Sequence, residues 1–137
     1  FEIWGALLNG LKLVVLPQST LLEAKHLARA ITKNNITMMW LTAGLFDQLV
    51  KEDANLFSRL NYLLVGGQAL NRELIYQLIQ NEQGRPKWII NGYGPTESTT
   101  FAVTYTIPLS YDGRDSVPIG RPIHNTTTYL LDAYLNP

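Results

Sequence analysis

The sequence of 137 residues contains no cysteine and only two histidines. Without cysteine there is no disulfide framework, no thiol catalysis and no cysteine-ligated zinc site. The two histidines, His26 and His124, are far apart in the sequence and are more simply surface or packing residues than metal ligands or catalytic groups. A chain without disulfides fits a cytoplasmic location.

The sequence also lacks an excess of charge of either sign. Eleven Lys and Arg residues balance eleven Asp and Glu residues, with no basic cluster and no acidic tail. Nucleic acids and anionic membranes attract clustered positive charge, so we expect neither as a partner. No apolar stretch reaches the ~20 residues of a membrane-spanning helix.

What the sequence does contain is a globular composition, with 46% hydrophobic and 16% charged residues. A chain of this length and composition can bury one domain-sized core. The chain opens on FEIWGALLNG without a starting methionine and stops just after an apolar run. We therefore expect both ends to be cut, so that residues 1–137 are part of a larger domain.

Short apolar runs alternate with segments of helical period along the chain. We expect four consecutive strands joined by helices, at Leu11–Leu16, Ile36–Leu41, Tyr62–Gly66 and Trp88–Asn91. Continuous apolar strands separated by amphipathic helices predict an α/β fold, with a parallel sheet that has helices on both faces.

The C-terminal part of the sequence has a different pattern. Residues 99–107 are rich in β-branched and aromatic side chains and predict a strand, whereas residues 110–125 are a loop with several glycines and prolines. A last strand is expected over residues 126–131. We therefore divide the chain into an α/β core, about residues 1–107, and a loop and strand, about residues 108–137, that lead to the next subdomain.

The most unusual stretch is NGYGPTEST, from Asn91 to Thr99, directly after the fourth expected strand. Tyr93 offers a flat ring for stacking, Thr96 a hydroxyl for a phosphate, and Glu97 a carboxylate for Mg²⁺. Together these residue types indicate a nucleotide site. The spacing alone leaves open a non-catalytic α/β module whose turn only shapes a pocket, because no Walker-type or GxGxxG phosphate loop is present.

Other unusual residues are expected near this turn. Trp40 and the pair Gly66 and Gly67 end the second and third expected strands. In open α/β sheets, ligands bind outside the carboxyl ends of the strands. These residues and the turn should therefore lie at one edge of the sheet.

NGYGPTEST resembles the Asn-x-Tyr-Gly-Pro-Thr-Glu signature of adenylate-forming (AMP-binding) enzymes, and most closely that of the amino-acid adenylation domains of nonribosomal peptide synthetases. FEIWGALLNG, YLLVGGQAL and VPIGRPIHNT are similar to further stretches of this family, so the resemblance covers essentially the whole chain. It implies a middle segment of the large N-terminal subdomain. The family's phosphate loop, its aspartates for the substrate ammonium and the ribose, and its catalytic lysine are expected outside this chain, and the isolated segment should be inactive.

The resemblance also implies a reaction. In this family the carboxylate of an amino acid attacks the α-phosphorus of ATP to give an aminoacyl-adenylate and pyrophosphate. The phosphopantetheine thiol of a carrier-protein domain then captures the adenylate, in an assembly line that also has condensation domains. An acyl-CoA synthetase-like adenylate-forming enzyme, which shares the Tyr-Gly-x-Thr-Glu element, is the closest alternative.

The same resemblance assigns roles to residues of the turn. Tyr93 is expected to stack on adenine, with Asn91 near the adenine amino edge. Thr96 is expected to contact the α-phosphate and Glu97 to help hold Mg²⁺, which makes these two the expected catalytic residues. The full ATP- and AMP-binding set is Gly67, Asn91, Gly92, Tyr93, Gly94 and Thr96.

A second set of residues matches the amino-acid pocket of the family: Phe1, Trp40, Leu64, Gly66, Gly92, Thr100 and Phe101. The set is apolar apart from one hydroxyl, and burying a polar substrate side chain there without partners would be costly. The glycines leave room while the aromatic rings fill volume, which favours a short, branched aliphatic substrate. The set also resembles a valine-type pocket, so we expect valine, with isoleucine next.

Overall fold

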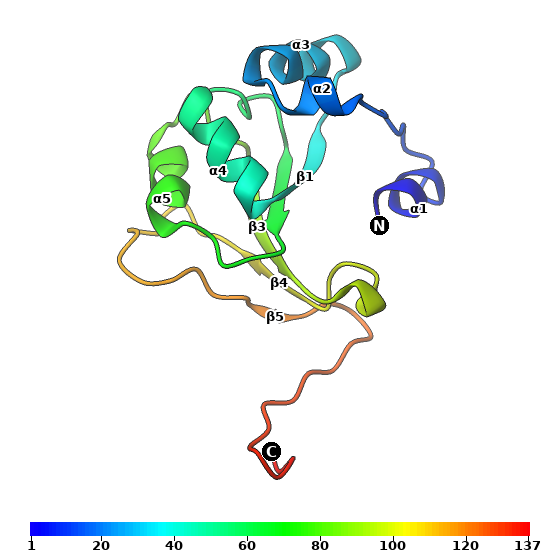
Figure 1. Ribbon diagram of the computed structural model, residues 1–137, viewed down its shortest axis with the longest axis vertical. Coiled ribbons are helices and arrows are strands. Elements are labelled where there is room, and N and C mark those ends of the chain that lie inside the picture. Colours follow the sequence, from blue (N-terminus) through cyan, green and yellow to red (C-terminus); the bar gives the residue numbers. More distant parts are fainter.

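A computed structural model describes residues 1–137. Three helices precede the first strand, strands and helices then alternate as far as β3, and the last third of the chain has little regular structure (Figure 1). The elements are α1 (Glu2–Leu7), α2 (Gln18–Leu21), α3 (Ala24–Asn34), β1 (Met38–Thr42), α4 (Ala43–Glu52), β2 (Tyr62–Gly66), α5 (Arg72–Gln80), β3 (Trp88–Tyr93), the 3-10 turn η1 (Thr96–Ser98), β4 (Val103–Thr106) and β5 (Arg121–Pro122). None of the helices is long and apolar enough to cross a membrane.

The strands form one mixed sheet of five strands in the order β1-β2-β3-β4-β5. β1, β2 and β3 are parallel, and Trp40, Leu64 and Ile90 lie side by side across them. β4 runs antiparallel to β3, and β5 runs antiparallel to β4. The α/β class and the three parallel strands are confirmed, and the strand expected within residues 99–107 is β4.

The direction of β4 has a simple cause. A parallel neighbour of β3 would need a crossover of about a dozen or more residues, usually a helix. Residues 94–102 contain only a turn and η1 between the two strands. The chain therefore reverses after β3, and the sheet is mixed instead of wholly parallel.

Two expected strands do not form. Residues 11–16 and 126–131 have no regular structure and pair with none of the five strands. Several of their apolar side chains are open to solvent, with Val15 82% exposed and Leu130 94% exposed, whereas Leu16 packs against the edge of the core. The predictions were wrong because apolar composition marks a strand only where a neighbouring strand accepts its backbone hydrogen bonds.

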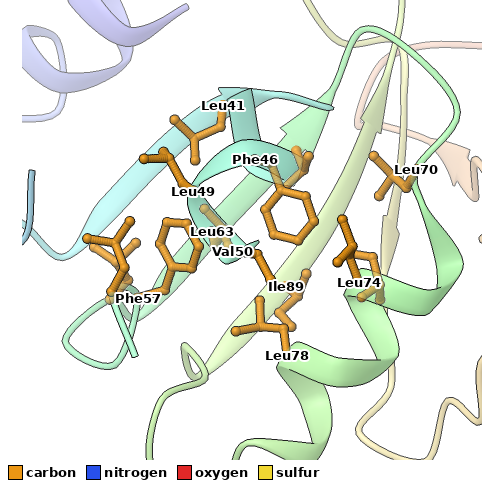
Figure 2. Packing of buried hydrophobic residues seen from close by; sticks show 14 of the residues in the cluster. Leu41, Phe46, Leu49, Val50, Phe57, Leu63, Leu70, Leu74, Leu78 and Ile89 are labelled. Atoms are coloured by element: carbon orange, nitrogen blue, oxygen red, sulfur yellow. The ribbon is translucent and has the colours of Figure 1, made fainter. Parts of the chain in front are cut away.

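One apolar core lies between the sheet and the helices α3, α4 and α5. Buried residues recur at helical spacing in α4, at Phe46, Leu49 and Val50, and in α5, where Leu74 and Leu78 are among them. Figure 2 shows these side chains over Leu63 and Ile89 of the sheet. Burying such side chains stabilises the fold by about 1.5–3 kcal/mol each.

The long helices cover one face of the sheet in this chain. Successive crossovers β1-α4-β2 and β2-α5-β3 advance in one direction across the sheet, and right-handed crossovers then place both helices on the same side. The opposite face carries Trp40, Leu64 and Ile90. Phe1, which directly precedes the short helix α1, contacts the ring of Phe101.

Candidate functional site

The three parallel strands end together at one edge of the sheet. Thr42, Gly66 and Gly92 are aligned across the ends of β1, β2 and β3. The sequence predicted that Trp40, Gly66 and Gly92 share this carboxyl edge, and the strand register confirms it for the two glycines, whereas Trp40 lies two residues before the end of β1, opposite Leu64. In open α/β sheets this edge is where ligands bind.

The glycines at this edge allow close contact between backbones. A Cβ atom added to Gly66 would lie 2.1 Å from the carbonyl oxygen of Gly92, so β2 and β3 lie together here without side chains between them. The next residue, Gly67, has a φ of +86°, a left-handed conformation that glycine adopts without strain. A Cβ atom added to Gly67 would meet nothing within 4 Å, so the glycine is required by its backbone conformation and not by close packing.

The turn after β3 is held closed by hydrogen bonds. The Ala102 amide donates to the Tyr93 carbonyl at 2.9 Å, and the Ser98 hydroxyl donates to the Pro95 carbonyl at 2.9 Å. A Cβ atom on Gly94 would lie 2.6 Å from the Ala102 nitrogen, so the turn has no room for a larger residue there. These contacts fix a compact turn at the ligand edge.

The chemically useful side chains of this turn face solvent. Tyr93, at the end of β3, is 54% exposed, and Thr96 and Glu97 in η1 are also exposed. The structure therefore brings a ring, a hydroxyl and a carboxylate together on one turn, as the sequence predicted. All three are accessible to a ligand at the edge of the sheet.

Asn91 lies differently from its neighbours. It is only 5% exposed, and its Nδ2 atom donates to the Pro118 carbonyl oxygen at 2.8 Å. Asn91 and Tyr93 are two positions apart on β3, so their side chains point to the same face of the sheet. Asn91 is thus adjacent to the exposed ring and is tied to a distant part of the chain.

The residues expected in the amino-acid pocket gather on the opposite face. The Phe101 ring packs edge-on against Phe1 and Trp40, with ring centroids 5.3 and 6.3 Å apart. Gly92 lies directly beneath this ring, since a Cβ atom there would be 2.3 Å from a ring carbon. Leu64, 7% exposed, is the neighbour of Trp40 in the strand register.

Thr100 and Trp40 complete this description. Thr100, half-buried, precedes Phe101 and has a φ of +85°, which is unusual for a threonine. The indole Nε1 of Trp40 is buried without a hydrogen-bond partner. Phe1, Trp40 and Phe101 are therefore in contact, with Gly92 against the Phe101 ring, Leu64 beside Trp40 and Gly66 beside Gly92, whereas Thr100 is linked to this group only as the neighbour of Phe101 in sequence.

Sequence patterns missed three residues at this site. Thr42 ends β1 beside Gly66, and its hydroxyl accepts a hydrogen bond from the Leu45 amide at the start of α4. A threonine directly before a helix is a capping signal that the sequence offered. The other two are Pro118 and Arg72, which both contact or belong to the loop between β4 and β5. Neither residue stands in a local sequence pattern that would indicate this role.

Two ionisable groups have shifted pKa values, and both lie outside the turn. Burial raises the pKa of the Tyr111 phenol, against a lowering contribution from Arg72. Backbone amides of Asn136 and Tyr134 donate to the Asp132 carboxylate and lower its pKa.

Comparison with known families decides the assignment. The sequence model of the AMP-binding enzyme family matches residues 1–137. The chain belongs to the AMP-binding enzyme family. More narrowly, it is a segment of an adenylation domain of the nonribosomal peptide synthetase type, as the turn sequence predicted.

Several proteins similar to this AMP-binding segment are much longer. Surfactin synthase subunit 2 of Bacillus subtilis (strain 168) is 45% identical over 132 residues, which is 96% of this chain and 4% of that protein. Gramicidin S synthase 2 of Brevibacillus brevis is 41% identical over 134 residues, or 98% of this chain and 3% of that protein. The chain thus spans only a few per cent of each relative.

Solved structures agree with the fold. PA1221, a nonribosomal peptide synthetase protein containing adenylation and PCP domains, matches with a TM-score of 0.83 at 33% identity over 98% of this chain and 27% of that chain. The N-terminal subdomain of Klebsiella oxytoca NpsA in complex with 3-hydroxybenzoyl-AMSN matches with a TM-score of 0.80 at 29% identity, covering 99% of this chain and 34% of that chain. The expected position within an N-terminal subdomain is therefore confirmed.

Proposed function

We propose that this chain is part of a ligase domain that uses ATP to activate an amino acid as its aminoacyl-adenylate. One observation carries the proposal, the exposed side chains of Tyr93, Thr96 and Glu97 on a single closed turn at the carboxyl edge of three parallel strands. The chemistry needs little more from a protein than positioning and charge stabilisation, which a rigid turn can supply. Similarity to several peptide synthases supports it.

In this proposal the nucleotide binds at the turn, on the side of the sheet that the helices cover. Adenine stacks on Tyr93, with Asn91 at its amino edge, and Thr96 contacts the α-phosphate. The backbones of Gly67, Gly92 and Gly94 line the slot. The exposure of Tyr93 supports this placement.

Mg²⁺ fits this site only together with the nucleotide. The chain has no group of three or more His, Cys, Asp or Glu side chains that could hold a metal ion. Mg²⁺ usually binds through one or two carboxylates, with substrate phosphates and water as its other ligands. Glu97 is such a carboxylate, and the bound ion would neutralise charge on the phosphates.

The amino acid occupies the other face of the sheet. Phe1, Trp40 and Phe101 form an apolar wall near Leu64 and Thr100, and Gly66 and Gly92 let the neighbouring backbone and the Phe101 ring approach closely. No charged or amide side chain belongs to this group, so a polar substrate side chain would lose its hydrogen bonds with water unpaired. We propose valine as the substrate, with isoleucine next.

The larger protein supplies the partners. A carrier-protein domain captures the adenylate on its phosphopantetheine thiol, and condensation domains of the same assembly line use the product. Residues 1–107 contribute the α/β core, and residues 108–137 lead toward the next subdomain. We place the protein in the cytoplasm, where ATP and free amino acids are present.

Amino-acid-dependent exchange of pyrophosphate into ATP by the intact parent tests the proposal. We expect valine to support exchange, and Tyr93→Leu to raise the KM for ATP about tenfold, because base stacking contributes about 1–3 kcal/mol. Exchange with a fatty acid but with no amino acid would indicate an acyl-CoA synthetase-like enzyme. Absence of Mg·ATP binding would indicate a non-catalytic module.

A further inference from the structure

The connection between β3 and β4 joins the two halves of the candidate site. It stands out beyond the ends of both strands and carries Thr96 and Glu97 on its first part (Figure 1). Its last part ends at Phe101, whose side chain is only 6% exposed and packs against two other aromatic rings. Residues 99–100, which we call the joint, link the exposed turn to this buried ring.

The joint has an unusual backbone. Thr99 has a φ of +58° and Thr100 a φ of +85°, so two consecutive residues adopt left-handed conformations. Of the other residues with positive φ, apart from glycines, none is β-branched. A β-branched residue is strained in this region, and such strain persists only where the surrounding structure imposes it.

The surroundings hold the joint from both sides. On the turn side, the Thr99 amide donates to the Thr96 carbonyl oxygen at 3.0 Å. Gly94 lies against the next residue, since a Cβ atom on it would be 2.9 Å from the Thr100 carbonyl oxygen. On the strand side, the buried ring of Phe101 anchors the chain. The Thr99 side chain is itself exposed, so it adds little packing to offset the strain.

We propose that the joint couples the two substrates, so that the amino acid and the nucleotide each strengthen the binding of the other. The inference rests on the proposed function, which places the amino acid against Phe101 and the nucleotide on Thr96 and Glu97. Each ligand makes its contacts only while the joint keeps its left-handed conformation. The first ligand to bind offsets the cost of the strain, and the second binds to a site that is already formed.

Thr99 is a positioning residue in this arrangement, because its side chain touches neither ligand. It acts through the backbone alone, by setting how costly the left-handed conformation is. Its replacement by residues with a different cost should therefore change the coupling between the two ligands. A residue with only a structural role would change the stability of the fold and leave the coupling as it was.

Equilibrium binding to the intact parent tests the coupling without catalysis. The probes are valine and α,β-methylene-ATP, a nucleotide that cannot release pyrophosphate. We expect saturating valine to lower the Kd for this nucleotide about fivefold or more, as is usual for two coupled sites. An unchanged Kd would overturn this inference alone. Absence of nucleotide binding would overturn the proposed function and this inference with it.

Replacements of Thr99 test the joint itself. Glycine adopts a left-handed conformation without strain and asparagine with little, whereas valine has the shape of threonine and the same strain. We expect Thr99→Gly to lower the Kd for the nucleotide without valine about two- to tenfold, and to bring the coupling close to one. Thr99→Asn should lie between Thr99→Gly and the wild type, and Thr99→Val should keep the full coupling. Equal coupling in the glycine and valine variants would overturn the proposal.

Asn35 provides the matched control. It also has a left-handed conformation, with a φ of +52°, and is exposed at the end of α3, away from the turn. Asn35→Thr places a β-branched residue in that conformation and should lower the thermal stability of the parent while leaving the coupling unchanged. If Asn35→Thr changed the coupling as much as Thr99→Gly does, the effect would come from overall stability and the proposal would be wrong.

Discussion

The ring of Phe101 occupies the space that a side chain on Gly92 would need. A Cβ atom on Gly92 would lie 2.3 Å from Cε1 and 2.5 Å from Cδ1 of that ring. The same ring packs edge-on against Phe1 and Trp40. Changes at positions 92 and 101 should therefore depend on each other, as is usual for residues in contact.

This dependence gives a first prediction. In the intact parent, Gly92→Ala should lower kcat/KM for valine by about tenfold or more, because the added methyl group displaces the Phe101 ring. Combining it with Phe101→Leu should restore part of the loss, with a coupling of about 0.5–3 kcal/mol. A double-mutant cycle measured by pyrophosphate exchange checks this, and purely additive effects would contradict the packing of these two residues.

A second prediction concerns substrate choice. Replacing Trp40 by Leu should enlarge the pocket and shift preference from valine toward leucine or isoleucine. The wild type should already accept some isoleucine, since one methylene in an apolar pocket is worth only about 1–3 kcal/mol. Exchange assays with a panel of amino acids provide the measurement.

Trp88→Leu is the matched control for Trp40. Trp88 is the first residue of β3, so it lies at the end of the strand opposite to the turn. Its side chain is 43% exposed. Its replacement should leave the order of substrates unchanged. A wild type that prefers a charged or aromatic amino acid would show that the pocket residues are wrongly chosen.

The third prediction concerns Glu97. Glu97→Gln removes a formal charge with little change of shape, so adenylation should fall by about tenfold or more while amino-acid binding changes little. A higher Mg²⁺ concentration should recover part of the loss. Glu82→Gln, at an exposed position after α5, is the control and should behave as wild type. Normal adenylation by Glu97→Gln would reduce Glu97 to a surface residue of the turn.

A fourth prediction concerns residues 1–137 produced alone. Large apolar side chains such as Trp4, Leu8 and Val15 are exposed in this chain, at 65%, 77% and 82%. Apolar surface of this kind promotes association, so we expect the segment to bind a hydrophobic dye, to be poorly soluble and to have no exchange activity. A sharp cooperative unfolding transition together with valine-dependent exchange would contradict this.

Much of the sheet could be predicted because the pattern that marks each strand lies within a short stretch of sequence. The apolar runs that became β1, β2 and β3 are continuous and are followed by amphipathic helices or by the turn. Residues 11–16 have a similar composition, but a strand also needs a partner, and sequence period does not report one. The direction of β4 likewise depended on the length of the connection and not on its own residues.

The candidate site likewise has one part that the sequence predicted and one part that it did not. Tyr93, Thr96 and Glu97 lie within one short motif, so their proximity could be predicted. The hydrogen bond between Asn91 and Pro118 joins residues 27 positions apart, and nothing in either local sequence indicates it. Contacts of this kind are set by how β4 returns the chain to the edge of the sheet.

The alternation of side chains along β1 and β2 has a consequence for how substrate choice can change over time. Leu41, Leu63 and Val65 face the helices and belong to the apolar core, whereas Trp40 and Leu64 face the other way. Substitutions on one face need not loosen packing on the other. A lineage of such proteins can therefore alter which monomer it selects at little cost in folding, and new specificities become accessible through few mutations.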